Sequence, residues 1–282
     1  MIENQVLMDK VLRAALEEDI GAGDITTDAI IDHAAQGNAI LETREQIVLA
    51  GLPVFARTFE LLSPLMEIET HYKDGQIVPA GGRICRLSGS LSVILKAERT
   101  ALNFIQRMSG IATLTREYVE KVGSEKVRLL DTRKTAPGLR FFDKYAVRMG
   151  GGFNHRFGLY DAILIKDNHI TAAGSITKAV HLAKKNTSHS IKLEVEVEKL
   201  ALIEEAIMAG ADTILLDNMS IKEISEAVHM VAGRIPVEVS GGVNLENIDE
   251  IARTGVDFIS VGALTHSVRA VDLSLEVLPD NN

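Results

Sequence analysis

The second half of the chain alternates short apolar runs with amphipathic segments, and this alternation constrains the fold more than any other feature. The apolar runs are residues 127–130, 162–165, 192–197, 213–216, 236–239 and 258–261. Segments with helical spacing separate the later runs, at residues 174–186, 198–209, 220–232 and 244–254. Strands that are apolar throughout and alternate with helices are typical of a parallel sheet with helices outside it.

An internal repeat indicates how this α/β half closes. Residues 209–217 read Ala-Gly-Ala-Asp-Thr-Ile-Leu-Leu-Asp, and residues 254–262 echo them as Thr-Gly-Val-Asp-Phe-Ile-Ser-Val-Gly. Each copy combines a helix end, a capping glycine, an aspartate and a buried strand. Polar residues follow every predicted strand, whereas an open sheet would concentrate them at one switch point, so a closed barrel fits better. We count six strands, fewer than the usual eight.

The first part of the chain has a different pattern. Residues 6–20 have helical spacing and stop at Gly21 and Gly23, and residues 24–28 then form a polar turn or a helix cap. Strand-like segments follow at 38–49, 66–73, 76–78 and 83–87, separated by Asp74-Gly75 and Gly81-Gly82. This pattern predicts an α+β unit with an antiparallel sheet.

Composition excludes several classes of protein. The net charge of -9 and the 4% of aromatic residues argue against a nucleic-acid partner or an anionic membrane surface. Cys85 is the only cysteine, which excludes an internal disulfide and a cysteine-rich zinc site. The N-terminal segment is acidic, unlike a signal peptide, and no apolar run approaches the roughly 20 residues of a membrane span. We therefore expect a cytoplasmic location and no membrane partner.

A long helix predicted at residues 92–108 carries one unusual cation. Arg99 lies about 200° around the axis from Ala97 on the main apolar stripe, and leucines at positions 95 and 102 flank it. One interpretation is an arginine that extends its charged group to water along an apolar surface. The other is that Arg99 reaches an anionic ligand or a partner subunit.

Six strand ends carry the candidate site. They read Asp131-Thr132-Arg133-Lys134, Lys166-Asp167-Asn168-His169, Glu194-Val195-Glu196, Asp217-Asn218, Ser240-Gly241-Gly242 and Val261-Gly262-Ala263. In a barrel these ends converge on one mouth. Each has a simpler interpretation as a solvated loop, a helix cap or a strand's solvent-facing side. Six polar ends together favour a shared active site.

The residue types at these ends indicate an anionic substrate with phosphates. Residues 131–169 hold seven Lys or Arg and four Asp or Glu, in an otherwise acidic chain. Arg133 and Arg156 suit bidentate binding of carboxylates, and Lys166, His155 and Lys134 add further positive charge, with Lys134 suited to a leaving group. The small residues at 240–242 and 261–263 allow a phosphate to approach the backbone. Glu196 and Asp217 are suitable ligands for Mg²⁺.

These residues resemble the quinolinate phosphoribosyltransferase family, from about residue 10 to residue 270. The long motifs that carry the resemblance are Arg133-Lys-Thr-Ala-Pro-Gly-Leu-Arg140, Gly-Gly-Gly-Phe-Asn-His155-Arg156, Leu-Ile-Lys166-Asp-Asn-His-Ile, Leu-Leu-Asp217-Asn and Glu98-Arg99-Thr-Ala-Leu-Asn-Phe.

The resemblance implies an activity and an architecture. The reaction takes quinolinate and phosphoribosyl pyrophosphate to nicotinate mononucleotide, pyrophosphate and CO₂, with Mg²⁺, in de novo NAD biosynthesis. The implied architecture is an N-terminal open α/β sandwich at residues 1–112 and a six-stranded incomplete β/α barrel at 113–266. We expect residues 267–282 to pack back on the N-terminal domain, and the chain to form a homodimer or a higher oligomer.

The resemblance also assigns roles to single residues. Arg133, His155, Arg156 and Lys166 would hold the quinolinate carboxylates, and Arg99 would reach the quinolinate site of the neighbouring subunit. Lys134, Glu196 and Asp217 would be catalytic, with Lys134 facing phosphoribosyl pyrophosphate and the two carboxylates serving the metal. Residues Ser240, Gly241, Gly242, Val261, Gly262 and Ala263 would hold the 5′-phosphate.

Three alternatives remain open on the sequence alone. A phosphate-binding barrel lyase could use Lys134 or Lys166 to form a Schiff base. A related phosphoribosyltransferase could act on another acid. The chain could also be an anion-binding module without catalytic activity.

Overall fold

The computed structural model describes residues 4–279, so residues 1–3 and 280–282 of the two predicted terminal segments lie outside the described residues. The described chain forms two compact units. Unit 1 takes its residues from Met1–Arg116, Pro137–Gly151 and Val268–Asn282, and unit 2 takes its residues from Glu117–Ala136 and Gly152–Ser267.

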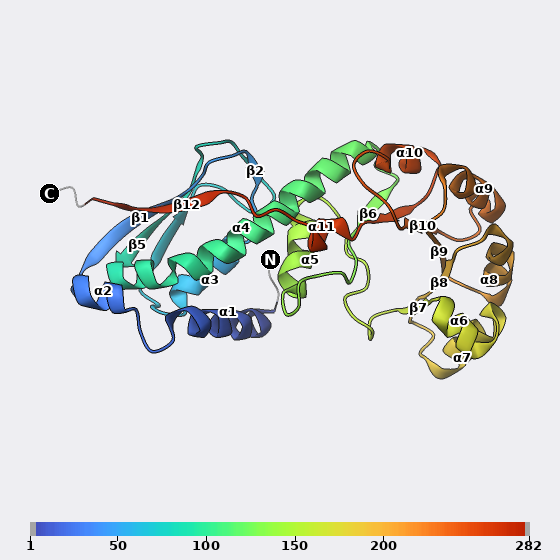
Figure 1. Ribbon diagram of the computed structural model, residues 1–282, viewed down its shortest axis with the longest axis horizontal. Helices are drawn as coiled ribbons and strands as arrows, with labels where there is room; N and C mark the ends of the chain where they lie inside the picture. The colour runs from blue at the N-terminus through green and yellow to red at the C-terminus, as the bar shows by residue number, and fades with distance from the viewer. Residues whose placement is uncertain (1–3, 280–282) are drawn as a thin grey trace. The chain divides into compact units, whose positions relative to one another are not determined.

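Unit 1 is built on a four-stranded antiparallel sheet. Its strand order is β12-β1-β5-β3, with β1 at Gln36–Thr43, β3 at Glu67–Thr70, β5 at Arg83–Ser90 and β12 at Leu273–Leu278. Strands β2 (Ile47–Val48) and β4 (Ile77–Val78) form a second, two-stranded sheet. The C-terminal segment therefore completes the sheet of the N-terminal part through β12 (Figure 1).

The helices of unit 1 cover this sheet with an apolar core. They are α1 (Gln5–Ile20), α2 (Ile25–Ile30), α3 (Leu52–Glu60), α4 (Leu91–Val122, whose last turns belong to unit 2) and α5 (Arg140–Met149). Leucine and phenylalanine side chains of α1 and α3 and the stripe of α4 pack against β1, β5 and β12 in one buried cluster. The polar stretch after α1 is a helix cap as predicted, because Asp24 accepts hydrogen bonds from the backbone N–H groups of Thr26 and Thr27.

Helix α4 is longer than the sequence pattern predicts, because it continues through Gly110 to Val122. Gly110 does not end the helix. A Cβ atom at this position would lie 2.2 Å from the carbonyl oxygen of Arg269, so the glycine allows a close backbone approach inside unit 1. A glycine that serves packing cannot be distinguished by sequence from one that ends a helix.

Unit 2 contains the parallel sheet predicted from the alternating pattern. Its strands are β6 (Arg128–Leu130), β7 (Ile163–Ile165), β8 (Leu193–Val197), β9 (Thr213–Asp217), β10 (Val237–Ser240) and β11 (Phe258–Ser260). Their order is β6-β11-β10-β9-β8-β7, and every neighbouring pair is parallel. Because β6 and β7 are the two ends of the sheet, the barrel is incomplete, as the family resemblance implied, and is not closed as the polar strand ends alone indicated.

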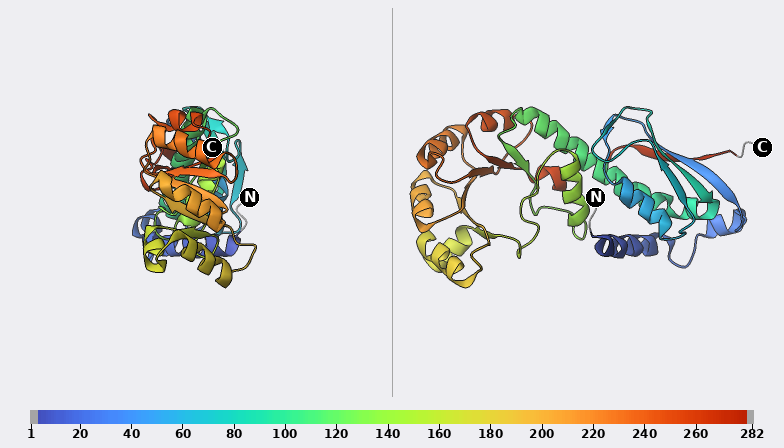
Figure 2. Two further views of the ribbon diagram at one scale, coloured as in Figure 1. Left: turned by 90° about the vertical axis from the view of Figure 1, so that its right-hand side faces the viewer. Right: turned by 180° about the vertical axis from the view of Figure 1, so that it is seen from behind.

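All the helices of unit 2 except α11 lie outside this curved sheet (Figures 1 and 2). The helical segments that lie wholly in this unit are α6 (Asp167–Ala173), α7 (Ile176–Asn186), the 3₁₀ turn Leu200–Leu202, α8 (Ile203–Ala209), α9 (Ile221–Val231), α10 (Ile248–Arg253) and α11 (Ala263–His266). Within residues 4–279, no helix has the length and apolar character needed to cross a membrane.

The aspartates of the internal repeat fix the starts of the strands. Asp212 Oδ2 accepts a hydrogen bond from Leu193 N at 2.8 Å, and Asp257 Oδ2 accepts one from Val237 N at 2.8 Å. In return, the backbone N–H of Asp212 donates to the carbonyl oxygen of Leu193, and that of Asp257 donates to the carbonyl oxygen of Val237. Each copy of the repeat therefore sets the register of its strand against a neighbouring strand.

Candidate active site

The carboxyl ends of the parallel strands surround one pocket of about 440 Å³ in unit 2. The residues predicted from the strand ends and their loops that line it are Arg133, Lys134, His155, Arg156, Lys166, Glu196, Asp217, Ser240, Gly241 and Gly242. Residues more than a hundred positions apart in the sequence thus form one wall, which favours the shared site over separate solvated loops.

Four predicted residues do not line this pocket. Val261 is buried, and Ala263 begins α11. Gly262 lies beside the pocket residue Lys134, since a Cβ atom at Gly262 would lie 3.0 Å from Lys134 Cδ. Arg99 is an exposed residue of α4 in unit 1. Its predicted reach into a neighbouring subunit stays a prediction.

The two predicted metal ligands lie on neighbouring strands. Glu196 on β8 is only 9% exposed and forms an ion pair with Lys166, whose side chain comes from the end of β7. Asp217 at the end of β9 accepts a hydrogen bond from Asn218 Nδ2 at 2.8 Å. Carboxylate oxygens of this kind fit a hard cation such as Mg²⁺, which completes its coordination with substrate oxygens. The burial of Glu196 also excludes the alternative that this side chain is only a strand's solvent-facing side.

The cationic side of the pocket is preorganised for an anion. Arg156 Nη1 donates a hydrogen bond to the carbonyl oxygen of Ala162 at 3.0 Å, which fixes the guanidinium plane. Burial, and then the charge of Arg133, lowers the pKa of Arg156 from its ordinary value, although the guanidinium remains protonated at neutral pH. Two cations that repel each other in this way gain stability when a carboxylate or phosphate enters between them.

The glycines after β10 have two different roles. Both lie in the left-handed region, with φ of 86° at Gly241 and 64° at Gly242. A Cβ atom at Gly241 would lie 2.2 Å from Asn218 Oδ1, whereas none of the surrounding atoms lies within 4 Å of the corresponding point at Gly242. Gly241 therefore admits Asn218, and Gly242 leaves space at the pocket wall.

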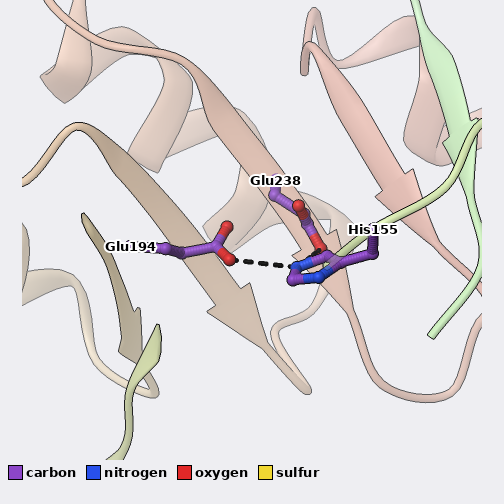
Figure 3. A group of neighbouring side chains, drawn as sticks. All are labelled: His155, Glu194 and Glu238. Atoms are coloured by element: carbon purple, nitrogen blue, oxygen red, sulfur yellow. Dashed lines mark hydrogen bonds and ion pairs between the residues drawn. The ribbon is translucent and has the colours of Figure 1, made fainter. Parts of the chain in front are cut away.

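A buried group of three side chains forms the wall near His155 (Figure 3). His155 Nε2 lies 3.0 Å from Glu194 Oε2 and 3.6 Å from Glu238 Oε1. The backbone of His155 is held by Asp131, whose Oδ1 accepts a hydrogen bond from His155 N at 2.9 Å. The ligand atoms of this His155–Glu194–Glu238 cluster all lie within 4.8 Å of one another.

Glu238 is the most deeply buried member of the His155–Glu194–Glu238 cluster. Glu238 is only 2% exposed, and Ser260 Oγ donates a hydrogen bond to Glu238 Oε1 at 2.6 Å. Burial raises the pKa of the Glu238 carboxyl above its ordinary value, and the nearby Glu194 carboxylate raises it further. Perturbed carboxyl groups of this kind are frequent in active sites.

Several pocket residues were not predicted as site residues from the sequence. They are Thr132, Leu164, Leu215, Asn218, Glu238 and Ser260. Leu164, Leu215, Glu238 and Ser260 each stand two positions before a predicted strand-end residue, and Glu194 has the same relation to Glu196. Because side chains alternate along a strand, these residues face the same side as the strand ends. Counting back two positions from each polar strand end would have found Leu164, Leu215, Glu238 and Ser260.

Comparison with known proteins identifies the family. The model of the quinolinate phosphoribosyl transferase N-terminal domain matches residues 24–109, and that of the C-terminal domain matches residues 111–276. A protein of Bacillus subtilis named probable nicotinate-nucleotide pyrophosphorylase [carboxylating] is 43% identical over 278 residues, which cover 99% of this chain and 96% of that protein.

Solved structures of other proteins resemble this chain over nearly its whole length. The crystal structure of NadC from Streptococcus pyogenes is 44% identical, with a TM-score of 0.94, and covers 98% of this chain and 99% of its own. The nicotinate-nucleotide pyrophosphorylase from Francisella tularensis is 46% identical with a TM-score of 0.93, over 98% of this chain and 97% of its own. With both domain models matched in order and relatives similar over nearly their full length, the chain belongs to the quinolinate phosphoribosyl transferase family.

Proposed function

We propose that this protein transfers the phosphoribosyl group of phosphoribosyl pyrophosphate to quinolinate, giving nicotinate mononucleotide, pyrophosphate and CO₂. The observation that carries the proposal is the pocket at the carboxyl ends of the parallel strands of unit 2. It joins a cationic wall of Arg133, Arg156 and Lys166 to the carboxylates Glu196 and Asp217. Relatives named nicotinate-nucleotide pyrophosphorylase [carboxylating] support the same reaction.

The charges of the pocket suit both halves of this reaction. Quinolinate brings two carboxylates, which the guanidinium groups of Arg133 and Arg156 can bind in a bidentate manner, with Lys166 as a further cation. Lys134 lies in the same wall as a point charge for the departing pyrophosphate. Positive charge develops on the ribose as pyrophosphate leaves, and nearby carboxylates stabilise it. Positioning and charge neutralisation therefore supply most of the catalysis, without a nucleophilic side chain.

Mg²⁺ fits the oxygen ligands of this pocket. Glu196 and Asp217 are the residues that would hold it, at the ends of β8 and β9. Two carboxylates suffice because Mg²⁺ retains waters and takes further oxygens from substrate phosphates. When bound, the ion neutralises charge on the pyrophosphate leaving group. The open wall at Gly242, with Ser240 and with Gly262 beside Lys134, is our candidate for the 5′-phosphate.

The proposal includes a homodimer in which Arg99 completes the quinolinate site of the partner. An exposed arginine between leucines on α4 supports this role, because a charged side chain on an apolar face is suited to a ligand across a subunit interface. We also infer a cytoplasmic location from the single cysteine. Burial raises the pKa of the Cys85 thiol to about 12, so this thiol is unreactive rather than a disulfide partner.

The first test measures both products in one assay. Purified protein with quinolinate, phosphoribosyl pyrophosphate and Mg²⁺ is expected to release pyrophosphate and CO₂ in equal amounts, and nicotinate in place of quinolinate is expected to give little turnover.

Lys134→Ala and Glu196→Ala should each lower kcat by about 10²–10⁴-fold, since each removes charge stabilisation from the transition state. Thermal unfolding should show both variants folded.

A matched control separates this effect from a change in surface charge. Lys222 is an exposed lysine on α9, and Lys222→Ala should retain the wild-type rate. Near-normal rates in Lys134→Ala and Glu196→Ala would contradict the proposal. Covalent trapping of quinolinate or ribose on Lys134 or Lys166 by borohydride would favour the Schiff-base lyase instead.

A further inference from the structure

Two members of the His155–Glu194–Glu238 cluster, Glu194 and Glu238, have no part in the proposed transfer step. Two of its members, His155 and Glu238, line the pocket, and the Glu194 carboxylate points toward the His155 ring (Figure 3). Glu194 and Glu238 come from β8 and β10, and His155 from the loop after Phe153. The cluster is therefore a buried polar group with one side open to the substrate pocket.

The hydrogen bonds of His155 define its protonation. The backbone N–H of Arg156 donates to His155 Nδ1 at 2.7 Å, so Nδ1 is an acceptor and carries no proton. The proton of the neutral imidazole is then on Nε2, which donates to Glu194 Oε2 at 3.0 Å. A metal bound at Nε2 would require the proton to move to Nδ1, where the Arg156 N–H already points. This geometry favours a site that holds protons over a metal site.

One carboxyl of the cluster must then carry a proton. The neutral His155 ring offers a single N–H to two glutamates, and Glu194 receives it at the shorter distance. Two ionised carboxylates so close together in a buried site would repel each other strongly. Glu238 is the more buried of the two, and burial raises its pKa. The neutral acid is therefore Glu238.

We propose, on the basis of the function proposed above, that Glu238 is the acid that protonates C2 of the pyridinium ring after the 2-carboxylate has left. The bond between C2 and the carboxylate carbon breaks, CO₂ departs, and the electron pair stays on C2 beside the positively charged ring nitrogen. That pair forms a new C2–H bond with the Glu238 proton, which leaves a Glu238 carboxylate. Solvent reprotonates this carboxylate after the products leave, so each turnover consumes one proton.

Four other donors that line the pocket are less suitable for this step. The guanidinium groups of Arg133 and Arg156 retain their protons at any working pH. The ammonium group of Lys166 forms an ion pair with the buried Glu196, and losing its proton would leave that carboxylate without a counter-charge. The Ser260 hydroxyl donates to Glu238 itself. Glu238 alone among these groups combines a neutral acid with a place on the pocket wall.

Glu238→Gln tests the proposal, because the amide keeps the shape and accepts the hydrogen bond from Ser260 but cannot supply an acidic proton. In a single-turnover experiment with Glu238→Gln, we expect pyrophosphate to form at close to the wild-type rate. Net CO₂ release and formation of nicotinate mononucleotide should slow by about 10²–10⁴-fold. The carboxylated nucleotide should accumulate between the two steps and be visible in quenched samples. Water acting in place of the acid accounts for the residual rate.

The control is Glu226→Gln on the exposed surface of α9, which should leave both steps unchanged. Equal slowing of pyrophosphate and CO₂ in Glu238→Gln would show a structural role and overturn the proposal, as would wild-type rates of both. If the wild-type protein forms neither product from these substrates, the proposed function fails and this inference with it. If pyrophosphate and CO₂ form together in both the wild type and Glu238→Gln, this inference is overturned and the proposed function stands.

Discussion

Glu238 is a carboxyl group placed where little water reaches its charge. The side chain lies inside the wall of the barrel, with Ser260 donating to one oxygen and the Glu194 carboxylate nearby. An ionised group in such a place is costly, so the protein retains the proton. The folded state therefore binds a proton at neutral pH that the unfolded chain, with its solvated glutamate, does not bind.

This difference predicts a pH-dependent gap in stability between the wild type and Glu238→Gln. The folded pKa is raised to about 8, and the unfolded value is about 4.3. Between these values the folded state holds more protons than the unfolded state, so the contribution of Glu238 to wild-type stability falls as pH rises. Gln does not titrate. The melting temperature of the variant minus that of the wild type should therefore grow from about pH 5 to about pH 8.

Thermal unfolding at several pH values measures this gap, with Glu226→Gln as the control. An exposed glutamate has similar surroundings in both states, so its gap should stay flat across the same range. A constant difference for Glu238→Gln, or one that shrinks with rising pH, would show that Glu238 is already ionised in the folded protein.

The sequence predicts the polar rim of the site better than its wall. Arg133, Lys166 and Asp217 follow apolar strands directly, and that pattern is visible without a structure. Glu238 lies within an apolar run, between Val237 and Val239, so its spacing from Ser240 is the only local signal that it faces the site. Its role depends on its distance from His155 and Glu194, which only the folded chain brings about.

The strands of unit 2 are joined in register by side chains as well as by the backbone. Asp212 and Asp257 each accept the first backbone N–H of a neighbouring strand, at Leu193 and Val237. These bonds lie at the amino ends of the strands, opposite the pocket. In barrels of this type the amino-end face contributes stability and the carboxyl-end face contributes chemistry.

Asp212→Ala and Asp257→Ala should therefore destabilise the protein without changing its chemistry. Each leaves a partly buried N–H group without its acceptor, which costs about 1–3 kcal/mol of the free energy of unfolding. Urea denaturation measures the loss, and kcat at a temperature where the variants are folded should stay near the wild-type value. Glu250→Ala, an exposed change on α10, is the control. An unchanged unfolding midpoint would mean that water replaces the carboxylate at no cost.

Element boundaries were predictable where periodicity decides them and not where tertiary packing does. The predicted strands of unit 2 lie within about a residue of those observed. Helix α4 was predicted too short because a glycine such as Gly110 usually indicates a helix end. Here Gly110 instead allows the backbone of Arg269 to approach the helix closely. Helix α5 follows Pro137-Gly138 closely, and the turn signal there hides the helix that begins at Arg140.

At the scale of the whole molecule, the proposed shared site gives a test by complementation. If Arg99 serves the partner's pocket, Arg99→Ala and Lys134→Ala homodimers should both be nearly inactive. Mixing them under conditions that exchange subunits creates heterodimers with one intact site, so activity should recover to about a quarter of the wild type. The unmixed variants are the controls. Recovery to no more than their average would place Arg99 in its own subunit's site, or outside the chemistry.

Unit 1 is assembled from three separate stretches of the chain, and its sheet takes its edge strand β12 from the last of them. During synthesis on the ribosome, β1 is made early, and its partner β12 leaves the exit tunnel only after all of unit 2. Until then one edge of β1 offers unpaired N–H and C=O groups, a template for pairing with another chain. A message that ends early, or a protease that trims the tail, therefore leaves an aggregation-prone product even though every pocket residue is present.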